Sequence, residues 1–305
     1  MNTPIIALKT ALVVFAVTVA SIPAATQQPA SGTAYWSAVE DALGRKGTMQ
    51  AENVIKFSFP RSDLFVVAGG VTLKPAFALG GWVAFKDTGK NRTIVMGDLV
   101  LADNEVSSVM QALQAGGVEQ TALHNHVLME TPRVMYMHIA AHGDRVKIAQ
   151  AIHNALALSK TPLGAVAPPA LPSAIDLDTA GIARALGVAG KLNGVVYQVS
   201  VPRAEKIMEM GTEILPSMGV ATAINFQPTG GGKAAITGDF VMRSSEVNHV
   251  IRALREHGIE VTAIHSHMLE ELPRLFFMHF WANDDAVTLA KGLRAALDQT
   301  SSKTK

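Results

Sequence analysis

Apolar residues recur at helical spacing in two stretches of the chain that lie far apart. The repeating residues are Val106, Val109, Met110 and Leu113 in the first stretch, and Val247, Val250, Ile251 and Leu254 in the second. Residues with this spacing fall on one face of an α-helix, so each stretch predicts an amphipathic helix. Asp103 is a suitable N-cap for the first helix, and Gly116 and Gly258 mark where the two helices end.

Short apolar segments on either side of a proline follow each helix. In the first copy they cover 119–128 and 133–141 and predict a β-hairpin, and a further helix is predicted over 144–158 and again over 285–297. Two strands around a glycine-containing turn precede each amphipathic helix, in "GWVAFKDTGKNRTIVMGDLVL" and "TAINFQPTGGGKAAITGDFVM". The predicted order is β-β-α-β-β-α after a short helix and further strands, an α+β fold with mixed or antiparallel sheets.

The chain is a tandem duplication. Residues 97–156 align with 238–297 without a gap, and further upstream "VIKFSFPR" (54–61) matches "VYQVSVPR" (196–203). The segment "KTPLGAVAPPALPS" (160–173) separates the copies, and its prolines disfavour helix and central strand alike. We therefore place repeat 1 at 35–159, a proline-rich linker at 160–173 and repeat 2 at 174–298.

The first 26 residues have the order of a secretory signal peptide. Lys9 precedes an apolar run from Ala11 to Ala20, and small residues follow it at Ser21, Ala24 and Ala25. The run is short for a transmembrane span, which needs about 20 apolar residues. We expect an exported protein, periplasmic or secreted, attached to a membrane only if this segment stays uncleaved.

Charge and cysteine content narrow the classes of function. With 26 basic and 25 acidic residues, the formal net charge among 305 residues is +1, so no field favours nucleic acid as a partner. The chain has no cysteine, which excludes disulfides, thiolate nucleophiles and thiolate metal ligands. Any strong metal site must therefore use His, Asp and Glu.

The hairpin carries the same polar set in both copies. The set is His-x-His-x3-Glu followed by a later histidine: His124, His126, Glu130 and His138 in repeat 1, and His265, His267, Glu271 and His279 in repeat 2. Side chains two apart on a strand share a face, so each set can converge on one ion if the strand continues. Three nitrogens and one oxygen suit Zn, Mn, Fe or Ni better than Ca or Mg.

Three other interpretations of the polar set remain open. The histidines can form a buried hydrogen-bonded network in a non-catalytic envelope module, or perform acid–base work without metal. One composite site between the repeats also fits the duplicated pattern. If a metal is bound and the protein is an enzyme, metal-activated water in a hydrolase is the simplest chemistry.

Arginines and aspartates recur beside the histidines. Arg133 and Arg274 follow prolines at turn exits, where they can clamp a small anionic ligand or pair with a repeated acid. Asp98 and Asp239 follow glycine within predicted strands, an unusual place for a carboxylate, so we expect them to have a partner or to contact the ligand.

Two resemblances bear on these patterns. The His-x-His-x3-Glu spacing resembles the first metal motif of cupins, as an analogy of ligands and not of fold. "MGDLVLADNEVSSVMQALQAGGVEQTALHNHVLMETPRVMYMH" and its second copy resemble the LppY/LpqO-like family of uncharacterised bacterial exported proteins. That resemblance implies export and this duplicated domain, but it implies no activity.

Overall fold

The computed structural model describes Met1 and residues 33–89, 92–164 and 174–303. The predicted signal peptide, apart from Met1, and residues 165–173 of the predicted linker lie outside the described residues. Within the described ranges, no helix is both long and apolar enough to cross a membrane.

Repeat 1 forms a six-stranded antiparallel sheet with the strand order β1-β2-β5-β6-β8-β7. Strands β3 and β4 form a separate two-stranded sheet. Its elements are α1 (Thr33–Leu43), β1 (Thr48–Met49), β2 (Val54–Pro60), β3 (Val67–Ala68), β4 (Val71–Thr72), β5 (Gly80–Gly89), β6 (Arg92–Ala102), the 3-10 turn η1 (Asp103–Glu105), α2 (Val106–Ala115), β7 (Glu119–His124), β8 (Val134–Gly143) and α3 (Arg145–Leu156).

Repeat 2 has the same plan, with the strand order β15-β16-β14-β13-β10-β9 and the separate pair β11 and β12. Its elements are α4 (Thr179–Leu186), β9 (Lys191–Asn193), β10 (Val196–Pro202), β11 (Ile207–Glu209), β12 (Thr212–Ile214), the 3-10 turn η2 (Pro216–Met218), β13 (Ala221–Gly230), β14 (Lys233–Arg243), α5 (Val247–Glu256), β15 (Glu260–His265), β16 (Leu275–Asp285) and α6 (Ala286–Leu297).

The central strands are buried on both faces. In β6, Val95 and Leu99 pack against helices α1, α2 and α3, whereas Ile94 and Met96 pack against residues of repeat 2. Successive side chains of a strand point to opposite faces, which explains why these strands are almost continuously apolar. Asp98 lies on the same face of β6 as Ile94 and Met96, and His138 of β8 is its partner in the sheet register. The side chains of Asp98 and His138 therefore face the other repeat.

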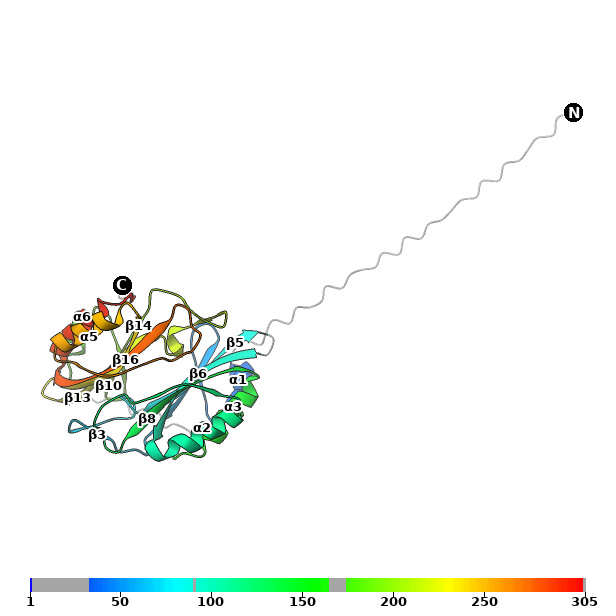
Figure 1. Cartoon of the computed structure of the whole chain (residues 1–305), viewed down its shortest axis with the longest axis horizontal. Coiled ribbons are helices and arrows are strands. Elements are labelled where there is room, and N and C mark those ends of the chain that lie inside the picture. Colours follow the sequence, from blue (N-terminus) through cyan, green and yellow to red (C-terminus); the bar gives the residue numbers. More distant parts are fainter. Residues whose placement is uncertain (2–32, 90–91, 165–173, 304–305) are drawn as a thin grey trace.

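The two sheets face each other, and the helices cover the outside (Figure 1). Two apolar clusters join the sheets. One combines Met96 and Ala84 of repeat 1 with Val241 and Phe277 of repeat 2, and the other includes Val196 of repeat 2. The molecule is thus a layered sandwich in which the inner faces of both sheets are shared between the repeats.

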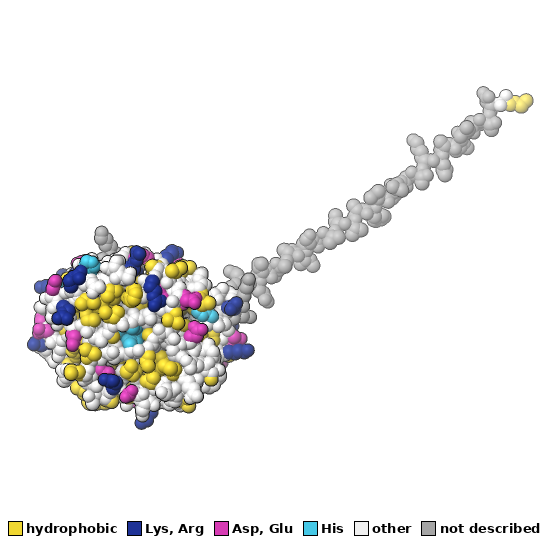
Figure 2. All heavy atoms as spheres, in the orientation of Figure 1, with side chains coloured by type: hydrophobic (Ala, Val, Ile, Leu, Met, Phe, Trp, Pro, Cys, Tyr) yellow, Lys and Arg dark blue, Asp and Glu magenta, His cyan; other side chains and the backbone are white. Residues whose placement is uncertain are grey.

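The face of the molecule seen in Figure 2 carries charges of both signs without a large region of one sign. Figure 2 shows lysine and arginine interspersed with aspartate and glutamate on the face in view, around groups of apolar side chains. Exposed apolar residues among the described ones include Met129, Leu269 and Leu272, which lie in the turns after β7 and β15.

The predicted fold class is confirmed, and the predicted β-β-α-β-β-α core corresponds to β5, β6, α2, β7, β8 and α3. Asp144 and Asp285 cap α3 and α6 through bonds from backbone N–H groups. Asp103 begins the 3-10 turn η1 instead, and Glu105 holds the N-cap position of α2. The first predicted hairpin strand is shorter than expected, because β7 ends at His124.

Candidate metal centre

Six histidines meet between the two sheets, three from each repeat. His138 lies on β8 and His279 on β16, directly opposite Asp98 on β6 and Asp239 on β14. His124 and His265 are the last residues of β7 and β15, and the remaining two, His126 and His267, lie in the loops that follow. All six rings and both carboxylates face the interface.

Contacts between the histidines cross from one repeat to the other. The Nε2 atoms of His124 in repeat 1 and His279 in repeat 2 lie 3.1 Å apart. Within repeat 2, those of His265 and His267 also lie 3.1 Å apart. The rings of His124 and His265 stack with centroids 3.7 Å apart. The composite arrangement is therefore the one that forms, not a separate cluster within each repeat.

The two aspartates flank the histidines. In repeat 2, Oδ2 of Asp239 lies 2.9 Å from Nε2 of His267, and in repeat 1 Oδ2 of Asp98 lies 3.6 Å from Nε2 of His126. Burial, and then the neighbouring charge of Asp239, raise the pKa of Asp98 well above its usual value. A cation or a proton beside the Asp98 carboxylate would offset the cost of burying its charge.

Hydrogen bonds hold two of the rings in a defined tautomer. Nδ1 of His279 lies 2.7 Å from the Gly238 carbonyl oxygen, and Nδ1 of His267 lies 3.0 Å from that of Gly219. Since a carbonyl only accepts, each Nδ1 carries the proton, and each Nε2 presents a lone pair when the ring is neutral. This partner arrangement is typical of histidines that bind metals.

Several buried polar atoms in the cluster have no hydrogen-bond partner. Among the described residues they include Oδ1 of Asp98 and Asp239, Nδ1 of His124 and His265, and Nε2 of His126 and His138. Unpaired buried polar atoms are rare in proteins, so six in one place are typical of a site that binds water or an ion.

Burial favours the neutral form of five imidazoles of the cluster. It lowers the pKa of His124 to about 2, and it lowers the pKa of His126, His138, His265 and His279 as well, with neighbouring histidines adding to the effect. Neutral imidazole is the form that binds transition metals.

Two groups of three histidines have the spacing of metal ligands. They are His124, His265 and His279, and His138, His265 and His267, and within each group the ligand atoms all lie within 4.8 Å of one another. Two nitrogens bound to one tetrahedral zinc at about 2.0–2.1 Å would lie about 3.3 Å apart. The observed 3.1 Å separations are close to that value.

The predicted glutamate ligands lie elsewhere. Neither Glu130 nor Glu271 belongs to either group of candidate ligands in the described structure. Oε1 of Glu271 accepts a 2.8 Å bond from the backbone N–H of Leu275, and Glu130 accepts a 3.4 Å bond from that of Val134. Because β7 and β15 end before these positions, the glutamates close the hairpin turns instead of facing the histidines.

The two arginines predicted to clamp an anion or to pair with an acid, Arg133 and Arg274, lie just before β8 and β16 and outside the described histidine groups. Arg274 is exposed and donates to the Met268 and Leu269 carbonyls and to Glu271, and Arg133 is exposed. Two other arginines that follow prolines, Arg61 and Arg203, form buried ion pairs. Arg61 and Arg203 each bind a glutamate near the start of a helix, Glu105 and Glu246 respectively.

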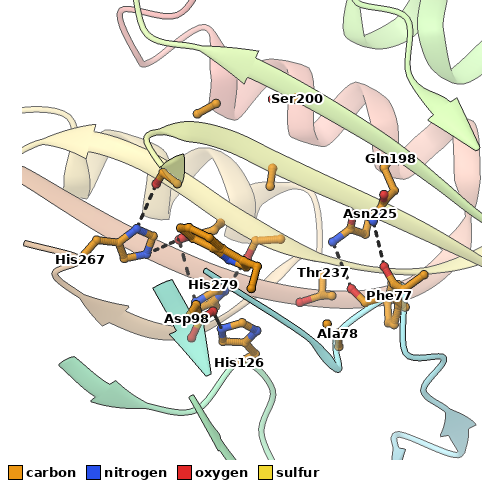
Figure 3. A pocket seen from close by; sticks show the side chains of 18 of the residues that line it. Phe77, Ala78, Asp98, His126, Gln198, Ser200, Asn225, Thr237, His267 and His279 are labelled. Atoms are coloured by element: carbon orange, nitrogen blue, oxygen red, sulfur yellow. Dashed lines mark hydrogen bonds and ion pairs between the residues drawn. The ribbon is translucent and has the colours of Figure 1, made fainter. Parts of the chain in front are cut away.

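A cavity of about 340 Å³ adjoins the cluster between the sheets. In Figure 3, His126, Asp98, His267 and His279 lie on one side of it, and Gln198, Asn225 and Phe77 lie on the other. Two further residues line it that no sequence pattern above singled out, Lys56 and Trp82. Lys56 carries a recognisable signal, because a lysine on a strand that is otherwise mostly apolar is unusual.

Reciprocal hydrogen bonds tie the two histidine loops together. The hydroxyl of Thr121 donates to the carbonyl of His267, and the hydroxyl of Thr262 donates to the carbonyl of His126, both at 2.6 Å. Thr121 and Thr262 occupy matching positions in the two repeats. Each repeat therefore positions the histidine loop of the other.

The chain belongs to the family described as "Domain of Unknown Function (DUF1259)". The model of this family matches residues 37–158 and again 180–299, once in each repeat. No curated protein matches the chain.

Solved structures give weak matches. The microcompartment shell protein PduB is 13% identical, with 83% of this chain and 90% of that chain covered and a TM-score of 0.21. EtuB from Clostridium kluyveri is 10% identical, with 82% and 90% covered and a TM-score of 0.18. At these TM-scores the likeness supports no argument about function.

Proposed function

We propose that the protein binds a first-row transition metal ion at the histidine cluster between its repeats. The observation that carries the proposal is the meeting of six buried histidines from both repeats, with six polar atoms of the cluster and its aspartates unpaired. The two ring groups share His265, so they offer places for one ion or for two neighbouring ions.

The local charges support a cation in this place. In the neutral tautomer set by Gly219, the lone pair of His267 Nε2 faces the Asp239 carboxylate at 2.9 Å, so two acceptors oppose each other. Such a contact is unfavourable unless a proton or a metal ion lies between or beside them.

Nitrogen-rich ligand sets suit Zn, Fe, Ni or Mn, and we propose an ion of this class. The adjoining cavity leaves room for water or a substrate beside the ion, which supports a metal-dependent hydrolase. A non-catalytic envelope module held together by its histidines is the second candidate, favoured by the hydrogen bonds from His267 and His279 to backbone carbonyls.

Metal content of the purified protein tests this proposal. The full mature chain, produced without a histidine tag, is stripped with a chelator, reloaded with Zn, Mn, Fe(II) or Ni, dialysed and measured by plasma mass spectrometry. We expect uptake of up to two equivalents, one for each histidine group. His265→Ala removes a ligand from both groups and should abolish uptake.

His249→Ala is the matched control, because His249 is exposed on α5, away from the cluster. It should take up metal as the wild type does. The double variant His126→Ala, His267→Ala tests the loop histidines in the same way. A reloaded wild type without metal, beside variants that are only less stable, would instead establish the histidines as a structural network.

We also propose that the protein acts outside the cytoplasm, on the evidence of the charged, apolar and small residues in its first 26 positions. N-terminal sequencing of the protein from its native host tests this, and an intact Met1 in a soluble cell fraction would contradict it.

A further inference from the structure

The two halves of the cavity are not equivalent. Repeat 1 contributes Lys56 on β2 and Trp82 on β5, and Nζ of Lys56 lies 4.0 Å from the centre of the Trp82 ring. In repeat 2 the matching strand positions hold Gln198 and Ala223, which also line the cavity. At these matched positions, only repeat 1 therefore contributes a positively charged side chain to the cavity.

The hydrogen bond made by Lys56 does not require its charge. Nζ of Lys56 donates to the carbonyl of Ser217 at 2.9 Å, and Nε2 of Gln198 donates to the carbonyl of Ala76 at 2.8 Å. In both cases a side chain of one repeat holds a loop of the other repeat, in matching positions. A neutral amide thus performs this structural task in repeat 2.

The charge of Lys56 is also not paired with a carboxylate. No ion pair within 4.0 Å involves Lys56 among the described residues, although other lysines, such as Lys86 and Lys206, have one. Burial lowers the pKa of Lys56 to about 8, against an opposing effect of Asp98. A half-buried ammonium group without an ion pair is costly, and a binding role would explain it.

The cavity is accessible and has space for a small molecule. Ser200, which lines the cavity, is exposed to solvent, so the cavity reaches the surface there. A volume of about 340 Å³ lies at the lower end of small-molecule sites. With one divalent ion bound, the ion and Lys56 would outweigh the charges of Asp98 and Asp239 by one positive charge, which a monoanion would neutralise.

We propose that this cavity binds a small ligand with an oxyanion group, a carboxylate or a phosphate, whose oxygens are held by the Lys56 ammonium. The other end of the ligand points towards the histidine cluster. This second part rests on the proposed metal function, whereas the contact at Lys56 does not.

Calorimetric titration with acetate and with inorganic phosphate tests the inference on the full mature chain, both zinc-loaded and chelator-stripped. Lys56→Gln is the main variant, since repeat 2 shows that glutamine at this position can hold the facing loop. We expect saturable binding of at least one probe by the wild type, weakened at least about tenfold in Lys56→Gln, as loss of a charge-assisted bond predicts. The stronger of the two probes identifies the class of oxyanion.

Two further variants separate charge from shape. Lys56→Arg keeps the positive charge and should retain binding, which provides a readout even if Lys56→Gln is unstable. Lys206→Gln removes a lysine that is exposed and paired with Glu213, and it should not alter binding. Metal content and circular dichroism of every variant are recorded alongside.

The outcomes for the anion and for the metal are distinguishable. A wild type that binds neither probe, or a folded Lys56→Gln that binds as well as the wild type, overturns the inference and leaves the metal proposal standing if zinc is retained. Lysine-dependent anion binding by a protein that takes up no metal supports the anion site and overturns the metal proposal.

Discussion

Five histidines of the cluster lose solvation on burial, and this makes their protonation unfavourable. The pKa values of these five, His124, His126, His138, His265 and His279, are lowered, mainly by burial. The same burial that prepares neutral ligands for a metal also makes the metal-free protein sensitive to acid.

We predict that the stability of the metal-free protein falls as the pH drops below about 6.5, the usual pKa of histidine in an unfolded chain. Below that pH the unfolded chain takes up protons that the folded cluster cannot accept, so each such histidine costs about 1.4 kcal/mol per pH unit. Asp98 and Glu209 act in the opposite direction, because burial raises their pKa values, but they are two groups against five.

Urea unfolding midpoints between pH 7.5 and pH 4.5 measure this effect. The double variant His124→Gln, His265→Gln removes two of the groups and should show a shallower decline. A wild-type midpoint that does not change between pH 7.5 and pH 5 would show that the histidines are protonated in the folded protein.

At the scale of single elements, the hairpin turns explain why the glutamates repeat with the histidines. Glu271 has a fully buried side chain, and it binds the backbone N–H of Leu275 and the guanidinium of Arg274. The repeated glutamate thus satisfies the backbone at the start of β16, and a weaker version of the bond occurs at Val134 in repeat 1.

We predict that Glu271→Ala destabilises the protein by about 1–3 kcal/mol, because it leaves the buried N–H of Leu275 without an acceptor. Metal uptake by the folded variant should be unchanged. Glu130→Ala should cost less, since Glu130 is only half-buried and its bond is 3.4 Å long.

Urea unfolding and metal analysis of the two variants test this together, with Glu271→Gln as the variant that keeps an acceptor oxygen. If the folded Glu271→Ala variant bound one metal equivalent less than the wild type, Glu271 would be identified as a metal ligand.

At the scale of the whole molecule, the repeats share their inner apolar faces. Ile94 of β6 is buried in the cluster that also contains Val241 and Phe277 of repeat 2. Together with the reciprocal bonds of Thr121 and Thr262, this packing makes each repeat part of the core of the other. We therefore expect the two repeats to unfold as one unit.

Calorimetric melting of the wild type and of Ile94→Ala tests this expectation. Truncation of a buried isoleucine costs about 2–5 kcal/mol, and the whole transition should move to lower temperature as a single peak. Two separate peaks, of which only one shifts in the variant, would show that the repeats are independent domains.

Much of this architecture could be predicted from the sequence, because periodicity and capping are local. Helical spacing placed α2 and α5, and the helices predicted over 144–158 and 285–297 correspond to α3 and α6, since each signal depends on neighbours only a few residues away. Comparison of the chain with itself revealed the duplication and the repeated histidines.

Only the tertiary structure decided how the repeated residues meet. β6 is apolar on both faces, which predicts burial but does not say that repeat 2 covers one of them. Once the sheets face each other, histidines from both repeats form one centre, the turn glutamates are left outside it, and Lys56 lines the adjoining cavity. These contacts depend on the pairing of surfaces distant in sequence, which no local pattern encodes.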